Sequence, residues 1–410
     1  MKILYNILTY IATFHLKIIA NFNTKLRLGV EGRKNTYKIL KSNISSQDKV
    51  IWFHCASLGE YEMGLPVFEE IKKLYPHHKI VLSFFSPSGF EIRKKNPLTD
   101  IVVYLPWDTK YNAKTFLNFV HPDLVIFVKY EIWPNYLNEL KRRKIRTILI
   151  SALFIKEQLF FKFYGGLMRK SLNVFEHIFV QDENSKELLK SIGFTNVTIS
   201  GDTRFDRVYN QLQIDNTLGF IKEFKQDKLC IVAGSTWTED EALIVDYINS
   251  TSEDLKFIIA PHNIKPKQIE NLKNSIQKKT ILFSEKERLD VSDYPVFIID
   301  TIGILSKIYS YADIVFVGGA VGNTGLHNTL EAAVFGVPII IGKNHKKFPE
   351  ANEMTERGGM YAISNQKEFD AILDSLALNT EKRKRSGSLN AIYIAKKCGV
   401  VIQIIHYIRK

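Results

Sequence analysis

A glycine-rich loop between two apolar strands constrains the fold of this chain more than any other feature. Residues 314–342 are IVFVGGAVGNTGLHNTLEAAVFGVPIIIG. The apolar run at 314–317 predicts a buried strand, and the stretch from about 327 to 335 predicts a helix that Gly336 ends. Residues 337–341 then start a second buried strand. A unit of strand, glycine loop, helix and strand is typical of a parallel α/β sheet.

The glycine loop allows two interpretations. A loop without side-chain bulk, next to free backbone N–H groups and the positive end of a helix dipole, suits a bound phosphate. Glu331, one turn into the helix, could then accept hydrogen bonds from a ribose diol. Alternatively, the glycines only make tight turns and Glu331 is a solvated helix residue. The spacing alone leaves both interpretations open.

Length and composition favour a two-domain globular protein with an anionic partner. The chain has 410 residues, enough for two domains, and its 45% hydrophobic and 24% charged residues are ordinary for a folded protein. Lys and Arg outnumber Asp and Glu by 56 to 43, which gives a net charge of +13 and favours nucleic acid, a phosphorylated metabolite or an anionic bilayer. The cysteines, Cys55, Cys230 and Cys398, show no disulfide or zinc spacing, so a reducing compartment is expected.

Residues 1–22 form an apolar segment that we expect to be a membrane anchor. The uncharged run, 3–14, is shorter than the ~20 residues of a spanning helix, and no cleavage site follows it. Lysines and arginines follow closely, at Lys25, Arg27, Arg33, Lys34, Lys38 and Lys41. An anchor lying on an anionic cytoplasmic leaflet fits this pattern. A tilted single span and a helix packed on the protein are the alternatives.

From residue 49 onward, strands alternate with helices. Strands are predicted at 50–55, 79–85, 101–105, 124–128, 146–151 and 177–181, and again at 229–233, 257–260, 296–300, 314–317 and 339–341. The stretch 201–207 separates two series, and polar residues to 226 suit a linker. We therefore predict two doubly wound, Rossmann-like α/β domains at 23–205 and 206–410 that face a central cleft. Many nucleotide-sugar glycosyltransferases have this architecture.

Two glutamates follow predicted strands of the first domain. Glu60 lies in the first turn of a helix, which favours its ionised form at neutral pH, so it could take a proton from a hydroxyl group. Glu131, before Ile132-Trp133-Pro134, could orient an acceptor or pair with a cation. A purely structural role is the alternative for both. The histidines lack paired metal-ligand spacing and no Asp-x-Asp follows a strand, so we expect neither a metal ion nor a cofactor.

Several segments together resemble one known family, the 3-deoxy-D-manno-octulosonic acid (Kdo) transferases of lipopolysaccharide biosynthesis. They span nearly the whole chain and include WFHCASLGE at 52–60, YLPWD at 104–108, EIWPN at 131–135, GDTRFD at 201–206, AGST at 233–236, DTIG at 300–303 and the segment 316–331.

This resemblance implies a GT-B glycosyltransferase that moves Kdo from CMP-Kdo to the lipid A precursor, lipid IVA, at the cytoplasmic face of the inner membrane. CMP-Kdo is then a co-substrate, and the N-terminal domain binds the acceptor while the C-terminal domain binds the donor. The family's catalytic base falls on Glu60. Its CMP contacts fall on Pro261, His262, Ile302, Gly303, Ile304, Asn328, Thr329, Leu330 and Glu331.

Four positions depart from the family's usual residues. His262 replaces an arginine, Ile304 a glutamate and Thr329 a proline, and Lys129 stands where an acid is usual. A GT-B enzyme for another nucleotide sugar is the first alternative function. A non-catalytic basic protein that binds membranes or nucleic acid is the second. The number of Kdo residues transferred and the acylation of the acceptor are not encoded in these patterns.

Overall fold

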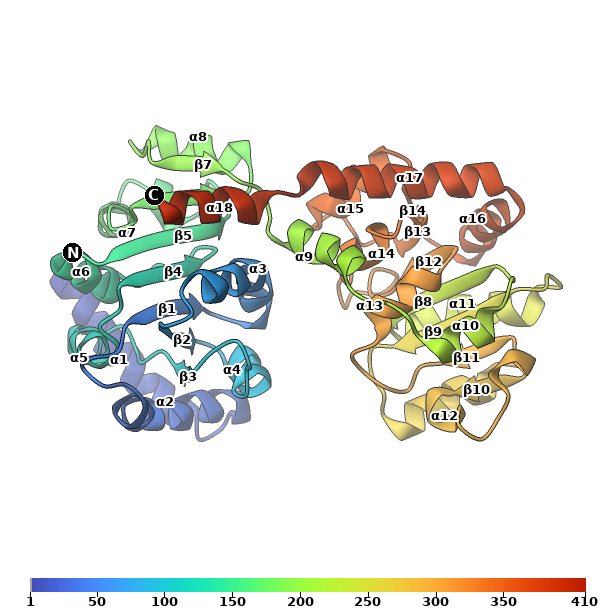
Figure 1. Ribbon diagram of the computed structural model, residues 1–410, viewed down its shortest axis with the longest axis horizontal. Helices are drawn as coiled ribbons and strands as arrows, with labels where there is room; N and C mark the ends of the chain where they lie inside the picture. Colours follow the sequence, from blue (N-terminus) through green and yellow to red (C-terminus); the bar gives the residue numbers. More distant parts are fainter. Residues whose placement is uncertain (1) are drawn as a thin grey trace. The chain divides into compact units, whose positions relative to one another are not determined.

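The computed structural model describes residues 2–410, which divide into two compact α/β units. The first unit comprises the described residues up to Asp206 together with Gly399–Lys410, and the second comprises Arg207–Cys398. Each unit is built on one parallel sheet of seven strands (Figure 1). Met1, the first residue of the expected anchor, lies outside the described residues.

The sheet of the first unit has the strand order β3-β2-β1-β4-β5-β6-β7, with every pair parallel. Its strands are β1 (Val50–Cys55), β2 (Lys79–Phe84), β3 (Ile101–Tyr104), β4 (Leu124–Val128), β5 (Arg146–Ala152), β6 (His177–Val180) and β7 (Val197–Ile199). The order reverses between β1 and β4. The loops after these two strands therefore begin at the switch point of the carboxyl edge, where such sheets bind ligands.

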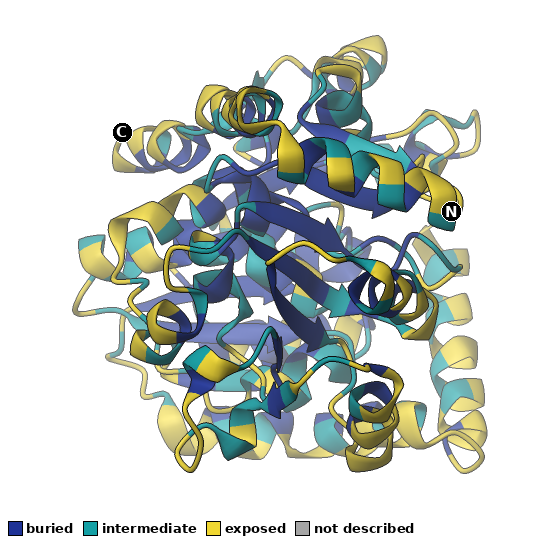
Figure 2. Cartoon of the chain, turned by 90° about the vertical axis from the view of Figure 1, so that its right-hand side faces the viewer, coloured by how far each residue is buried: buried dark blue, intermediate teal, exposed yellow. Residues whose placement is uncertain are grey.

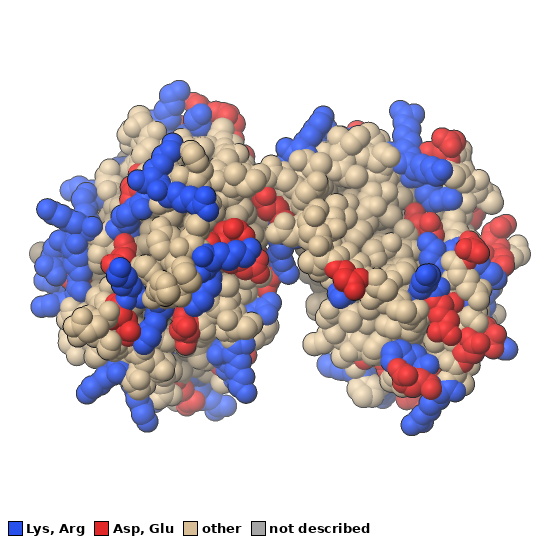
Figure 3. Space-filling model, viewed as in Figure 1, with Lys and Arg blue, Asp and Glu red and all other residues tan. Residues whose placement is uncertain are grey.

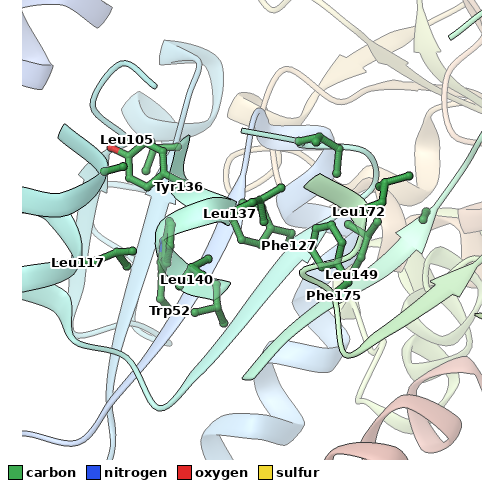
Figure 4. Packing of buried hydrophobic residues seen from close by; sticks show 14 of the residues in the cluster. Trp52, Leu105, Leu117, Phe127, Tyr136, Leu137, Leu140, Leu149, Leu172 and Phe175 are labelled. Carbon is green, nitrogen blue, oxygen red and sulfur yellow. The ribbon is translucent and has the colours of Figure 1, made fainter. Parts of the chain in front are cut away.

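The core of the first unit lies on both faces of this sheet. Successive residues of a strand point to opposite faces, so Trp52 belongs to one apolar cluster and Phe53 to the other. Figure 4 shows the Trp52 cluster, in which β1, β4 and β5 pack against α6. The helices are α1 (Lys2–Ile19), α2 (Thr24–Asn43), α3 (Leu58–Leu74), α4 (Pro87–Arg93), α5 (Lys110–Val120), α6 (Pro134–Arg143), α7 (Gly166–Leu172), α8 (Glu183–Ser191) and α18 (Val400–Arg409).

The sheet of the second unit has the order β10-β11-β9-β8-β12-β13-β14, also parallel throughout. Its strands are β8 (Cys230–Thr236), β9 (Lys256–Pro261), β10 (Thr280–Leu282), β11 (Val296–Ile298), β12 (Ile314–Val317), β13 (Ile339–Gly342) and β14 (Met360–Ile363). Its helices are α10 (Gly219–Lys225), α11 (Thr238–Ser250), α12 (Pro266–Ser275), α13 (Leu305–Ile308), α14 (Leu330–Ala333), α15 (Pro349–Glu356), α16 (Gln366–Leu378) and α17 (Thr380–Lys397). The strands are buried and the outer helix faces are exposed (Figure 2).

The second domain does not extend to residue 410 as predicted, because the last helix, α18, belongs to the first unit. Gly399 has a φ of 97° and breaks the helical run between α17 and α18. The apolar face of α18, including Val400, Ile404 and Ile408, is buried in the core of the first unit. The carboxylate of Asp206 accepts hydrogen bonds from the N–H groups of Gly399 (2.8 Å) and Val400 (3.1 Å), so it caps this helix.

The polar stretch up to residue 226 is not the linker that the sequence suggested. It forms helix α9 (Arg204–Asn210) and helix α10, and the Ile221 and Phe224 side chains of α10 are buried in the second unit. Helix α10 has only seven residues, too few for a clear helical pattern of apolar residues. The sequence analysis therefore relied on the polar composition of this stretch and predicted a linker.

Helix α1 presents its large apolar side chains to the outside. Nine of them, from Ile3 to Ile19, are 46–78% exposed, and α1 has no fully buried residue. The hydroxyl of Tyr5 donates to Asp108 at 2.6 Å and joins the helix to the first unit. Among the described residues, the stretch Thr380–Arg409 is long and apolar enough to cross a membrane, and α1 with α2 passes this test only as a pair bent by 119°.

Candidate active site

Glu60 stands where the sequence predicts it, just beyond β1 at the start of α3. Its side chain is turned inward, and the residue is only 7% exposed. One carboxylate oxygen, Oε2, accepts a hydrogen bond from the backbone N–H of Ala56. This contact holds the carboxylate against the end of β1, at the switch point of the first sheet.

Burial changes the expected ionisation of Glu60. Its position at a helix start favours the charged form, but the structure raises the pKa of Glu60 to about 7. Desolvation is the largest cause, and the nearby charge of Glu131 is the next, whereas the Ala56 N–H and the Lys129 charge act in the opposite direction. The predicted ionised form is therefore accompanied by a protonated form of Glu60 at neutral pH. A carboxyl with a pKa near 7 is well matched to accept a proton at neutral pH.

Glu131 follows β4, the strand next to β1, and belongs to a hydrogen-bond network that reaches into the core. The indole N–H of Trp133 lies 3.1 Å from Glu131 Oε2 and 3.0 Å from His54 Nε2. On its other side, His54 Nδ1 lies 2.8 Å from Ser83 Oγ, which also accepts the indole N–H of Trp52 at 2.7 Å. The Nδ1–H tautomer of His54 fits both contacts, because Nε2 can then accept from Trp133 while Nδ1 donates to Ser83. The network fixes Trp133 and, through it, Glu131.

In the second unit, the loops after β8, β9 and β12 meet through three aromatic rings. Trp237 stacks on His262 with a centroid separation of 4.6 Å, and His262 stacks on His327 at 4.5 Å. The Trp237 indole N–H donates to His327 Nε2 at 2.9 Å. Burial, with a smaller contribution from His262, lowers the pKa of His327 to about 4, so this ring is neutral at pH 7. His262, which replaces the arginine usual in the family, thus stacks between Trp237 and His327.

Several N–H groups of the glycine loop after β12 are already bonded within the protein. Gly319 has a φ of 98° and donates its N–H to the buried Asp240 at 2.8 Å, while the N–H groups of Gly325 and His327 bond to carbonyls within the loop. A side chain on Gly318 would lie 2.5 Å from the carbonyl of Ser235. Close packing on β8 therefore requires a glycine at position 318.

The helix after this loop is shorter than predicted. It spans Leu330–Ala333, and a left-handed Gly336 (φ 69°) ends the turn that follows, as expected. The Asn328 side chain accepts from the Leu330 N–H at 3.2 Å and donates to Glu331 Oε1 at 3.0 Å. Thr329 and Leu330 are buried, so their side chains face the protein. Asn328 thus occupies part of the helix start that the sequence suggested for a phosphate.

The remaining predicted donor residues also lie at the carboxyl edge of the second sheet. Pro261 ends β9, and Ile302, Gly303 and Ile304 follow β11, its neighbour. Ile302 is 77% exposed, and Gly303 has a φ of 92° with open space around its Cα. The turn after β11 is thus an accessible surface feature.

Sequence reasoning missed several residues of these clusters. The sequence analysis gave Trp237, His327 and Asp240 no binding role. Asp240 caps the start of α11, because its carboxylate accepts the Trp237 N–H at 2.9 Å. His54 and Trp133 were named only as parts of the segments 52–60 and 131–135, without a role of their own. Within residues 2–410, no group of three or more His, Cys, Asp or Glu side chains is placed to hold a metal ion.

Comparison with solved structures defines the class of fold. The UDP-GlcNAc 2-epimerase from Neisseria meningitidis, solved with UDP-GlcNAc, superposes with a TM-score of 0.57 over 87% of this chain and 100% of that chain, at 16% identity. Two parallel α/β units of this kind define the GT-B class, to which glycosyltransferases and such epimerases belong.

Sequence comparison then shows which proteins this chain resembles. The family described as 3-deoxy-D-manno-octulosonic-acid transferase matches residues 28–207. The Aquifex aeolicus 3-deoxy-D-manno-octulosonic acid transferase is 29% identical, over 87% of this chain and 95% of that protein. A bifunctional glycosyltransferase/methyltransferase from Fusobacterium nucleatum is 27% identical over 80% of this chain, which spans only 53% of its length. The chain is thus similar to Kdo transferases, which are glycosyltransferases, over most of its length.

Proposed function

We propose that this protein transfers Kdo from CMP-Kdo to a phosphorylated lipid A precursor, lipid IVA, with Glu60 as the general base. The observation that carries the proposal is the burial of Glu60 beside Glu131 at the switch point of the first sheet, which raises the pKa of Glu60 to about 7. The similarity to Kdo transferases and the GT-B fold support Kdo transfer as the reaction in which this carboxylate acts.

In the proposed reaction, the ionised Glu60 takes the proton of an acceptor hydroxyl. The hydroxyl oxygen forms a bond to the anomeric carbon of Kdo as the bond from that carbon to the phosphate oxygen breaks. The electron pair of the broken bond leaves with CMP. Glu131, held by the Trp133 N–H, orients the acceptor and keeps the pKa of Glu60 high enough for it to accept the proton.

The donor is proposed to bind at the carboxyl edge of the second sheet. Pro261, His262 and the accessible turn at 302–304 lie at this edge, and Glu331 is proposed to hold the ribose. Asn328, Thr329 and Leu330 are proposed to lie beside the phosphate. The Leu330 N–H would face it once the Asn328 side chain, which accepts that N–H at 3.2 Å, turns away. The reaction is proposed to need no metal ion and no cofactor, because no Asp-x-Asp follows a strand.

The acceptor side is proposed to face the cytoplasmic leaflet of the inner membrane. The exposed apolar side chains of α1 and the net charge of +13 support this location, because both favour an anionic bilayer. Lys and Arg side chains are prominent on the visible face of the first unit (Figure 3).

Product analysis by mass spectrometry tests the proposal. The full chain in vesicles is incubated with CMP-Kdo and lipid IVA, with UDP-sugars as alternative donors and with EDTA in a parallel reaction. We expect Kdo adducts of the lipid from CMP-Kdo alone, with or without EDTA. Transfer from a UDP-sugar, or no adduct from a folded protein that binds CMP, would contradict the proposed donor or the proposed reaction.

A further inference from the structure

A buried arginine of the first unit has no carboxylate among its hydrogen-bond acceptors. Arg33 of α2 is 8% exposed, and its three nitrogens donate to the backbone carbonyls of Leu105 (2.9 Å), Gly29 (2.8 Å) and Phe85 (2.6 Å). A guanidinium has five N–H bonds. Two of them therefore find no acceptor among the described residues.

Aromatic rings surround the same guanidinium. Its central carbon lies 4.1 Å from the ring centre of Trp107, 4.7 Å from that of Phe85 and 5.3 Å from that of Tyr104. Burial lowers the pKa of Arg33 to about 10, and only the Tyr104 and Tyr136 phenols, not a carboxylate, act in the opposite direction. The group remains a cation at neutral pH. Removing a charge from water without a counter-ion is costly, and a bound anion would offset that cost.

Two cavities adjoin Arg33, and basic residues line both. One has a volume of ≈ 370 Å³, with Lys17, Arg27 and Lys34 against a single acid, Glu31. The other has a volume of ≈ 410 Å³, with Lys25 and no acid. An arginine fork between two basic cavities has the chemistry that binds a phosphate ester.

The two cavities lie between the end of helix α1 and the carboxyl edge of the first sheet. Their walls include Lys17 and Ala20, at the end of α1, and also Phe85 and Trp107, which follow β2 and β3. Phe85 stacks on Trp133 with a centroid separation of 4.6 Å, and Trp133 donates to Glu131. A ligand held here would have its apolar part beside α1 and its polar part near the proposed catalytic carboxylates.

We propose that the two cavities around Arg33, termed here the Arg33 site, bind a phosphate ester carried by a membrane lipid. The inference rests on the proposed function, because it gives the phosphorylated lipid acceptor a specific phosphate subsite. A lipid is favoured over a free anion because the cavity walls continue into α1, whose apolar side chains are exposed. Arg33 supplies the fork, and the exposed Arg27 and Lys34 supply charge at the rim.

The test compares two matched pairs of substitutions on α2 in the full chain. Arg27→Ala with Lys34→Ala removes two cations from the cavity rim, whereas Lys38→Ala with Lys41→Ala removes two exposed cations outside both cavities. Binding is measured by co-sedimentation with phosphatidylcholine vesicles that contain phosphatidic acid, or oleate at the same surface charge. No CMP-Kdo is present, so failure of the transfer reaction does not affect this readout.

We expect the wild type to prefer phosphatidic acid to oleate and the rim pair to lose about 10- to 30-fold in affinity for phosphatidic acid, as two basic contacts allow. The outer pair should lose less than about threefold, because its charges contribute only to diffuse attraction. Equal losses in both pairs, or equal binding of both lipids, would overturn the proposal.

A third substitution and a competitor refine the result. Arg33→Lys keeps the charge but loses the planar fork, so it should also abolish the preference for phosphatidic acid. If this variant does not fold, the rim pair still decides. Inorganic phosphate, added at constant ionic strength, separates a lipid phosphate ester from free phosphate as the ligand. If it does not compete with the vesicles, the result supports the lipid ester. If it competes with the wild type but not with the rim pair, the result supports the phosphate group itself as the ligand. Normal stabilisation of the rim pair by CMP would show that the proposed donor site is intact.

Discussion

Glu131 raises the pKa of Glu60, although 71 positions separate the two residues in the sequence and each follows a different strand. The effect arises because β1 and β4 are neighbours at the switch point of the first sheet. Two carboxyl groups therefore lie close together at this edge of the sheet, but their surroundings differ. Glu60 is buried against Ala56, and Glu131 accepts a hydrogen bond from Trp133. The predictions below follow from this pair and from the contacts that hold it.

The first prediction concerns the pH dependence of transfer. A general base must be deprotonated, so kcat/KM should rise with pH through about 7. Glu131→Gln removes a charge that raises the pKa of Glu60, and the acid limb of the pH profile should therefore move to lower pH. The profile of kcat/KM is measured for both proteins. An unmoved limb would mean that Glu131 does not act on the catalytic base.

The second prediction concerns stability. The pKa of Glu60 is raised from 4.5 in the unfolded chain to about 7 in the folded protein, so the stability that its protonated form contributes is lost as pH rises through 7. Glu60→Gln cannot ionise and should be more stable than the wild type at pH 8, with an advantage about 2–3 kcal/mol larger than at pH 5. Urea unfolding at the two pH values measures the difference. An advantage that does not change with pH would refute the raised pKa.

A third prediction addresses the role of Trp133. Trp133→Phe retains a ring to stack on Phe85 but loses the N–H that bonds to Glu131 and His54. We expect kcat to fall about tenfold and CMP binding to be unchanged, because the lost contact positions the acceptor side only. Tyr111→Phe, at an exposed aromatic residue outside this network, is the control. A Trp133→Phe enzyme with normal kcat would show that the network has no positioning role.

The fourth prediction tests the cap of the last helix. Asp206→Ala removes the acceptor of the N–H groups of Gly399 and Val400 and should destabilise the first unit by about 1–2 kcal/mol. Asp246→Ala, at an exposed position of α11, should change stability by less than about 0.5 kcal/mol. Chemical unfolding followed by circular dichroism compares the two variants. If both unfold at the same urea concentration, the cap contributes nothing.

Most strands could be predicted from the sequence because buried parallel strands are continuous apolar runs. Predicted bounds at 50–55, 124–128 and 314–317 agree with β1, β4 and β12. The sequence analysis did not identify β7, β10 and β14. These strands are only three or four residues long and contain partly buried residues, so the apolar run in each is too short to stand out. The position of Glu60 just after a strand could be predicted because β1 is one of these continuous apolar runs.

What the sequence could not show are contacts between distant segments. The conformation of the glycine loop depends on Asp240, 79 positions earlier, which accepts the Gly319 N–H. The raised pKa of Glu60 depends on burial and on Glu131, which no local pattern reports. The Arg33 site likewise needs α2 to meet the ends of β2 and β3, so Arg33 looked like one of several basic residues after the anchor.

The most direct test of the account is Kdo transfer by Glu60→Gln, followed by mass spectrometry of the lipid product. Glutamine keeps an oxygen for the Ala56 N–H but cannot accept a proton at neutral pH, so transfer should fall by about 10²–10⁴-fold. Stabilisation by CMP should be retained, and Glu70→Gln on the same helix, whose side chain is 40% exposed, should transfer normally. Near-normal transfer by Glu60→Gln would contradict the assignment of Glu60 as the base.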